Sequence, residues 1–162
     1  MAASMFVKIK SIPGSSNVKG FENTIEVLSF SWAGSLPVGS QSSASAETVG
    51  QTHLSDLTIS KFADKSSPLL FANMTGGKRM AEDIELDVNK ILDGKSQTFL
   101  SIKLTNAIVS SFSTGGGGGG EPPVESISFN YVKVYFGFAN EDAGKLEAQV
   151  IKGWDNQKHE PL

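Results

Sequence analysis

Apolar and polar residues alternate with a period of two over much of this chain, the pattern of strands with one buried and one exposed face. In residues 81–90, "AEDIELDVNK", Ile84, Leu86 and Val88 alternate with three acidic residues, which predicts one buried and one wet face. The segments with strand character are residues 5–10, 24–32, 54–62, 81–90, 98–113 and 125–138. A chain rich in antiparallel strands is therefore expected.

Residues 24–32, "TIEVLSFSW", predict a half-buried strand with small hydroxyl side chains on its outer face. Leu28, Phe30 and Trp32 share one face of this strand. Ser29 and Ser31 occupy the other face, so they are expected to point away from the core.

Three segments depart from simple alternation. Residues 54–62 place Lys61 on the same side as Leu57 and Ile59, a mixed pattern that is still rich in residues common in strands. Residues 98–113 are long for one strand and are expected to bend. In residues 125–138 the apolar set shifts from Ile127, Phe129 and Tyr131 to Val132, Val134, Phe136 and Phe138. That shift predicts a bulge, or a segment covered on both faces.

One helix is predicted, within the sequence "DKSSPLLFANMTGG". Ser66 or Ser67 can cap its start, with Pro68 in the first turn and Gly76 or Gly77 at its end. The fold class expected is mainly β: a small antiparallel β-barrel, or a sandwich, with one short flanking α-helix.

Six consecutive glycines, residues 115–120, are predicted to form the tip of a hairpin. A phosphate-binding loop needs a lysine and a hydroxyl residue at the start of a helix, whereas Glu121, Pro122 and Pro123 follow here. A domain linker would separate two independent cores, but each flank is a single strand with one face to cover. Residues 114–123 are therefore expected to join two paired strands.

Length, charge and cysteine content exclude several classes of protein. With 162 residues the chain is expected to form a single domain, residues 1–162, in which residues 33–52 make an extended loop. Its net charge of −3, spread along the chain, offers no basic stripe for nucleic acid. There is no cysteine, so no disulfide is expected. The first residues contain no continuous apolar run, so neither a signal peptide nor a membrane span is expected.

Three groups of polar residues are candidates for catalysis or metal binding: His53 with His159, Asp83 with Glu85 and Asp87, and Lys65 with Ser66 and Ser67. The histidines lack a serine or carboxylate at suggestive spacing and are interpreted as surface residues. The acidic residues lie on a straight strand, which cannot wrap a calcium ion, so a solvated face is favoured. The serines beside the lysine fit helix capping better than a serine–lysine dyad. Neither an enzyme, a metal nor a cofactor is predicted.

The order of several motifs along the chain resembles the hemolysin-coregulated protein (Hcp) family, the tube subunits of bacterial type VI secretion systems. The motifs are "MFVKIKSIPGSS", "IEVLSFSW", "LTISKFADKSSPLLFANMTGGK", "IVSSFSTGGGGGG", "ESISFNYVKV" and "VIKGWD". They span nearly the whole chain. Two departures are a serine-rich loop at residues 33–52 and an unbroken glycine tip.

The resemblance implies a subunit that assembles into six-membered rings, which stack into a secreted tube inside a contractile sheath, under a VgrG spike. It also implies that the ring holds small effector proteins in its lumen as receptor and chaperone, with Ser29 and Ser31 facing that lumen. Such a protein would leave the bacterial cytoplasm through the secretion system without a signal peptide. Toxic relatives carry a further catalytic domain, and none is expected here.

Two surfaces follow for assembly. Val132, Val134, Phe136 and Phe138 are expected at the interface between ring subunits, because a doubly apolar strand suits burial by a neighbour. The loop of residues 33–52, with Leu36, Val38 and Val49 as its larger aliphatic residues, is expected to contact the next ring.

A monomeric β-sandwich that binds a ligand or glycan is the alternative from another class. Trp32 or Trp154 would supply its stacking platform, although Trp32 shares a face with Leu28 and Phe30 and fits the core better. The molar mass in solution separates a ring from a monomer.

Overall fold

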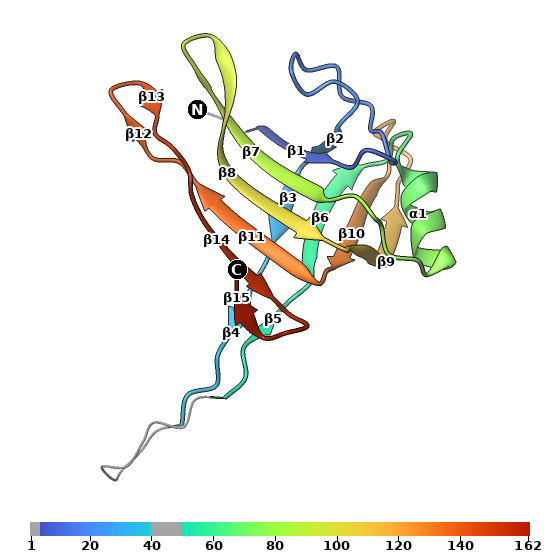
Figure 1. The fold of residues 1–162 in the computed structure, drawn as a ribbon. Coiled ribbons are helices and arrows are strands. Elements are labelled where there is room, and N and C mark those ends of the chain that lie inside the picture. Colours follow the sequence, from blue (N-terminus) through green and yellow to red (C-terminus); the bar gives the residue numbers. More distant parts are fainter. Residues whose placement is uncertain (1–3, 40–49) are drawn as a thin grey trace, which may run out of the picture.

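The structure, a computed structural model, describes residues 4–39 and 50–162. Its strands form two antiparallel sheets and two short hairpins (Figure 1). The larger sheet contains, in spatial order, β15 (Glu160–Pro161), β14 (Val150–Asp155), β11 (Lys133–Phe138), β8 (Lys95–Thr105), β7 (Ile84–Leu92), β1 (Ser4–Lys8) and β2 (Ile25–Val27). The smaller sheet contains β3 (Ser29–Ser31), β6 (Leu57–Phe62), β10 (Val124–Asn130) and β9 (Ile108–Gly115). The hairpins are β4 (Gly34–Ser35) with β5 (His53–Leu54), and β12 (Glu141–Asp142) with β13 (Lys145–Leu146).

The predicted mainly β class with one short helix is confirmed. Three short connections carry the chain from one sheet to the other, at Leu28, at residues 106–107 and at residues 131–132. The Leu28 N–H donates to the Ser60 carbonyl at 2.7 Å, which joins the two sheets at one corner of the barrel-like shape.

These connections explain the irregular segments of the sequence. The long segment 98–113 bends as predicted, at Asn106, whose backbone is left-handed with φ 52°. The shift of apolar residues after Tyr131 marks a change of sheet, and not a bulge or a doubly covered strand at that point. A register irregularity does lie earlier in the segment, between Ser128 and Phe129, where β10 pairs with β9. Leu28 is 46% exposed although it was expected in the core, because the strand is broken where the chain changes sheet.

The core lies between the two sheets. The side chains that β6 and β10 contribute are Leu57, Ile59, Ile127 and Phe129, and those of the larger sheet include Val7, Ile25, Ile84, Leu86, Ile102 and Leu104. All ten have no exposed surface. Complete burial of one such side chain contributes about 1.5–3 kcal/mol, so this cluster carries most of the fold's stability.

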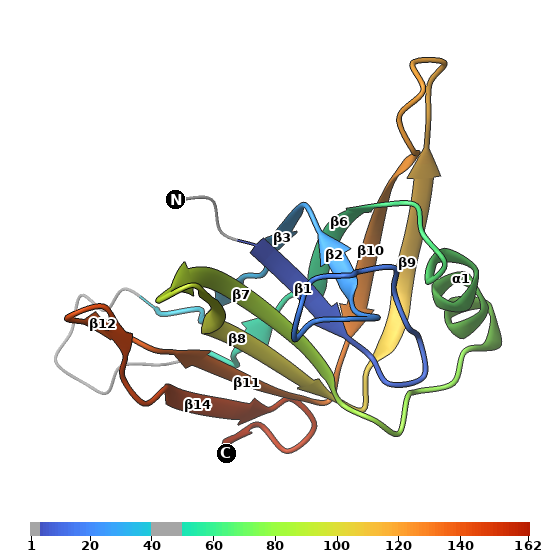
Figure 2. The same cartoon turned by 90° about the horizontal axis from the view of Figure 1, so that it is seen from above.

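The helix α1 (Ser67–Gly76) covers the β9 side of the smaller sheet (Figure 2). Ser66 is its N-cap, but the Ser66 hydroxyl makes no capping hydrogen bond; the Asp64 carboxylate accepts from the Ser66 N–H at 2.9 Å instead. Gly77 ends the helix in a left-handed conformation, as predicted. Within the described residues, no helix has the length and apolar character needed to cross a membrane.

The glycine run lies at the tip of the β9–β10 hairpin, which projects beyond both sheets (Figure 2). Gly115 pairs with Val124, and the residues between them form the loop. This is the placement that the sequence pattern predicted.

The face of β7 that carries the acidic residues is only partly exposed to solvent, which corrects the expectation of a fully solvated face for residues 81–90. Asp87 is 1% exposed, and its carboxylate lies 2.7 Å from the Lys8 ammonium. Phe6, opposite Asp87 on β1, stacks on Phe21 with ring centroids 4.7 Å apart. The segment that carries Phe21 thus covers one end of the larger sheet's outer face.

Candidate functional site

Eight serine and threonine side chains cover the outer face of the smaller sheet. They stand in two cross-strand rows, one of Ser29, Ser60, Ser126 and Ser113, the other of Ser31, Thr58, Ser128 and Ser111. All eight are exposed or half-buried. The Thr58 and Ser128 hydroxyls are hydrogen-bonded at 2.9 Å. We call these eight residues the hydroxyl face.

The hydroxyl face results from alternation in four neighbouring strands, with one register irregularity at Ser110 of β9. Successive side chains of a strand point to opposite sides, so the residues between the hydroxyls point into the core. Lys61 and Glu125 are among these inward residues, and they are cross-strand neighbours. The smaller sheet therefore keeps charge inside and presents small uncharged groups outside.

Lys61 and Glu125 form a buried ion pair beneath the start of α1. The Lys61 ammonium is fully buried and lies 2.7 Å from Glu125 Oε1 and 3.1 Å from Asp64 Oδ1. It also donates to the Phe62 carbonyl at 2.9 Å, while the Ser67 hydroxyl donates to Glu125 Oε1 at 2.5 Å. Because every charge has a partner, this cluster fixes α1 to β6 and β10 rather than offering a reactive group.

A second candidate surface is the part of the larger sheet's core-side face that the smaller sheet leaves uncovered. Phe136, Phe138 and Val150 lie there and are 40%, 46% and 69% exposed. Phe138 and Val150 are direct cross-strand partners, and the Trp32 ring centroid lies 5.6 Å from that of Phe136. We call Phe136, Phe138 and Val150 the apolar seam.

The structure divides the four residues predicted for the ring interface. Phe136 and Phe138 belong to the apolar seam. Val134 is 2% exposed and packs in the core, so its assignment to an interface is wrong. Val132 is half-buried at the change of sheet, where its N–H donates to the Thr105 carbonyl at 3.1 Å.

Both tryptophans pack partly against the core instead of standing free. The Trp32 indole N–H donates to the Tyr131 hydroxyl at 2.7 Å, which in turn donates to the Ser55 carbonyl at 2.7 Å. Burial raises the pKa of Tyr131 above its ordinary value. Trp32 and Trp154 line an apolar cavity of about 280 Å³ that also borders Phe136.

The β4–β5 hairpin begins the extended loop. Leu36 and Val38 are 46% and 63% exposed. The Gly50 N–H donates to the Pro37 carbonyl at 2.8 Å, which holds the two arms of the loop together. Val49, the third aliphatic residue predicted for ring stacking, lies outside the described residues.

The candidate catalytic and metal-binding residues of the sequence are dispersed in the structure. His53 lies exposed on β5, and His159 lies exposed in the turn before β15. The Lys65 ammonium contacts Asn23 at 3.3 Å, whereas Ser67 bonds to Lys61 and Glu125. Within residues 4–39 and 50–162, no three histidine or carboxylate side chains gather as metal ligands.

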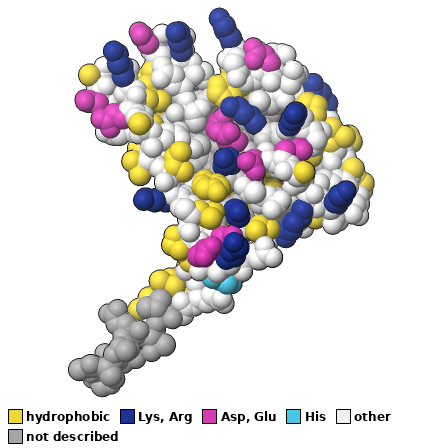
Figure 3. All heavy atoms as spheres, viewed as in Figure 1, with side chains coloured by type: hydrophobic (Ala, Val, Ile, Leu, Met, Phe, Trp, Pro, Cys, Tyr) yellow, Lys and Arg dark blue, Asp and Glu magenta, His cyan; other side chains and the backbone are white. Residues whose placement is uncertain are grey.

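The acidic residues of β7 instead join a charged pattern on the outer face of the larger sheet, where Lys and Arg are interspersed with Asp and Glu (Figure 3). Glu85 lies in register between Lys8 on β1 and Lys103 on β8. Burial, and then the neighbouring Asp87 carboxylate, raises the pKa of Glu85.

Two of the eight hydroxyl-face residues, Ser29 and Ser31, are predicted by the sequence pattern. The other six are carried by strands with the same alternation. Only the pairing of β3, β6, β10 and β9 shows that they share a surface, because a local sequence pattern does not determine the order of strands in a sheet.

Comparison with known proteins adds an independent line of evidence. Residues 6–138 match the family model described as "Type VI secretion system effector, Hcp". The chain is 32% identical over 157 residues to the protein hcp1 of Pseudomonas aeruginosa, covering 96% of each chain. A solved type six secretion system protein superimposes with a TM-score of 0.91 at 26% identity, covering 99% of this chain and 100% of the other. The crystal structure of Hcp1 from Salmonella typhimurium has the same fold, with a TM-score of 0.80 at 24% identity and complete coverage of both chains.

Proposed function

Because the chain belongs to the Hcp family of type VI secretion proteins, we propose that it is the tube subunit of such a system, closing into hexameric rings that stack and carry effector proteins. Membership of this family already establishes that the chain is a secreted type VI secretion protein and not an enzyme.

The observation that carries the proposal of ring closure is the apolar seam. Three large apolar side chains on the neighbouring strands β11 and β14 are exposed beside the core, and the exposed Lys152 is the cross-strand partner of Phe136 on the same face. Contiguous exposed apolar surface of this kind marks an interaction site. Contact between this surface and a different surface of the next copy is heterologous, and such contacts close into rings.

The hydroxyl face supports the proposal of an effector-binding lumen. Small side chains leave space, and eight hydroxyls can donate and accept hydrogen bonds to many partner surfaces. With no charge in either row, the wall neither selects nor repels cargo by net charge. Ser29 and Ser31 are then two members of a larger receptor surface.

The exposed Leu36 and Val38 support the proposal that the loop of residues 33–52 contacts the next ring in a stack. A long loop with exposed aliphatic residues gains from burial against a partner. Val49 is proposed to join them. A VgrG spike and sheath proteins complete the proposed partners, with export from the bacterial cytoplasm without a signal peptide.

The second candidate function, a monomeric ligand- or glycan-binding module, rests on the apolar cavity beside Trp32 and Trp154. In a ring this cavity adjoins the seam and would be covered by a neighbour. In a monomer it would be open to a sugar ring.

Light scattering of the purified chain distinguishes the two functions. A ring has six times the 17.2 kDa mass of one chain, and a monomer has that mass alone. If the purified chain stays monomeric at every concentration measured by light scattering, the tube proposal is overturned.

A further inference from the structure

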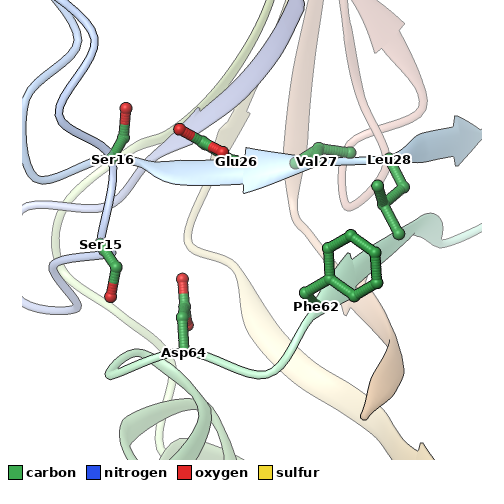
Figure 4. Close-up of a pocket in the computed structure, with 7 residues that line it drawn as sticks. All are labelled: Ser15, Ser16, Glu26, Val27, Leu28, Phe62 and Asp64. Carbon is green, nitrogen blue, oxygen red and sulfur yellow. The ribbon is translucent and has the colours of Figure 1, made fainter. Parts of the chain in front are cut away.

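A small cavity lies at the end of the hydroxyl face nearest the glycine hairpin. It is lined by Ser15, Ser16, Glu26, Val27, Leu28, Phe62 and Asp64 (Figure 4). We call it the Phe62 pocket. Its volume is about 200 Å³, less than the roughly 300–1,000 Å³ typical of pockets for drug-sized ligands, so it fits a single side chain.

The Phe62 pocket is continuous with the hydroxyl face. Phe62 lies on the outer side of β6, two residues beyond Ser60, and pairs across the strands with Val124. Leu28 precedes Ser29 and is hydrogen-bonded to the Ser60 carbonyl. Phe62, Leu28 and Val124 are all 40–46% exposed, so the hydroxyl face ends in apolar surface.

The two ends of the pocket differ in chemistry. In Figure 4 the Leu28 side chain and the Phe62 ring point toward each other at one end, and Ser15 and Asp64 lie at the other. Glu26 stands at the rim, on the strand β2. The lining contains two carboxylates and no lysine or arginine.

The negative charge at this end of the pocket is only partly neutralised. Lys61 lies 3.1 Å from Asp64 Oδ1 but is closer to Glu125, so one ammonium serves two carboxylates. Glu26 is exposed and adds a further negative charge at the rim. An apolar wall followed by negative charge complements a side chain with an aliphatic stem and a cationic end.

We infer that the Phe62 pocket receives a lysine or arginine side chain of a cargo protein bound at the hydroxyl face. The stem would pack between Leu28 and Phe62, and the cation would meet Asp64 and Glu26. This assignment rests on the proposed lumen, and it gives the otherwise uncharged wall a point of selectivity for cargo with an exposed basic residue.

The test uses the full chain with ¹³C-labelled leucine and valine methyl groups. The probe is a capped pentapeptide with a central arginine, and the matched peptide carries neutral citrulline instead. We expect a saturable shift of the Leu28 and Val27 methyl signals with the arginine peptide, and a markedly weaker response to the citrulline peptide.

Variants separate the pocket from general electrostatics. Glu26→Gln should weaken binding of the arginine peptide about three- to five-fold, the effect of one partly exposed charge pair. Glu147→Gln, which removes an equal charge from another exposed position, should leave it unchanged. Phe62→Ser should weaken binding of both peptides.

Equal shifts with both peptides, no shift at Leu28 and Val27, or equal effects of Glu26→Gln and Glu147→Gln would each overturn the inference. Light scattering on the same samples keeps it distinct from the proposed function. Rings that fail to bind the peptide refute the pocket alone, whereas a peptide-binding monomer refutes the tube.

Discussion

Lys61 links β6, β10 and the segment before α1 through its buried ammonium. A fully buried ammonium is unfavourable unless each of its protons finds an acceptor, and Lys61 has acceptors on β6, β10 and the segment before α1. Its position explains the mixed pattern of residues 54–62, in which a lysine shares the face of Leu57 and Ile59.

Replacing Lys61 with methionine should lower the free energy of unfolding by about 3–5 kcal/mol, because Glu125 is left buried without its cation. Urea unfolding measures the loss. The double variant Lys61→Met with Glu125→Leu should recover much of it. Lys103→Met, an exposed lysine, should cost less than about 1 kcal/mol and serves as control. A loss equally small for Lys61→Met would show that the pair contributes nothing.

Glu85 gives a prediction for the effect of pH on stability. Its pKa is raised in the folded chain, so its ionised form opposes folding. The opposition is absent well below the ordinary value of 4.5 and grows as the pH rises through the raised value. Glu85→Gln should therefore be more stable than the natural chain at pH 7, with the difference vanishing near pH 3.5 by denaturant titration.

Glu147→Gln, at an exposed position, supplies the comparison for Glu85→Gln. If the two variants show the same dependence on pH, the burial of Glu85 and its neighbour Asp87 has no energetic consequence.

At the residue scale, the sequence predicted orientation well within strands and poorly at their ends. Ser29, Ser31 and Lys61 lie on the sides that alternation assigned. Leu28 does not lie in the core, because a change of sheet interrupts its strand. Asp87 is buried by a segment distant along the chain, and no local pattern contains that information.

At the scale of elements, one face of β11 contributes both to the core and to the exposed apolar seam. Val134 packs in the core, whereas Phe136 and Phe138 extend beyond the cover of the smaller sheet. The sequence marks all three as apolar but gives no sign of where the cover ends. That boundary depends on the lengths of the strands that face β11.

A charge in the apolar seam should separate folding from assembly. Phe138→Asp is expected to retain the fold, since the side chain is already 46% exposed. It should lose ring mass in light scattering, because its cross-strand partners Val150 and Leu100 are apolar and the seam would bury an unpaired charge. Ile151→Asp is the matched control, since Ile151 is 53% exposed on the opposite face of β14. Full ring mass for folded Phe138→Asp would remove the seam from the interface.

The β4–β5 hairpin allows the loop to be shortened without disturbing either sheet. Replacing residues 36–51 with a Gly-Asn turn should preserve folding and ring mass, because β4 and β5 pair independently of the larger sheets. Tube formation, followed by electron microscopy, and secretion should be lost. Normal tubes from the shortened chain would place stacking elsewhere, with the glycine hairpin as the next candidate.

At the scale of the whole molecule, the outer faces of the two sheets differ in chemical character. The larger sheet carries interspersed charges (Figure 3). The smaller sheet carries the hydroxyl face. The sequence predicted the fold class because alternation and turns are local. The order of strands, and with it the eight-residue surface, results from pairing between segments that are distant along the chain, such as Leu57 with Phe129.

Ser31→Arg tests the hydroxyl face as a receptor. A long charged side chain should fill space in the proposed lumen, leaving ring mass unchanged and lowering the level of a co-expressed effector on immunoblots. Ser4→Arg, on an exposed position of β1, provides the control for added charge. An unchanged effector level with Ser31→Arg would take this residue out of the binding surface.

The glycine hairpin also makes this protein a candidate scaffold for display. Side chains added at Gly117, Gly118 or Gly119 would meet nothing within 4 Å, and doubling the length of a flexible loop costs only about 0.6 kcal/mol. A short epitope inserted there would leave the strands intact. Since β9 and β10 also carry half of the hydroxyl face, the epitope would stand at the mouth of the proposed channel, where antibody access reports whether a tube end is open or capped.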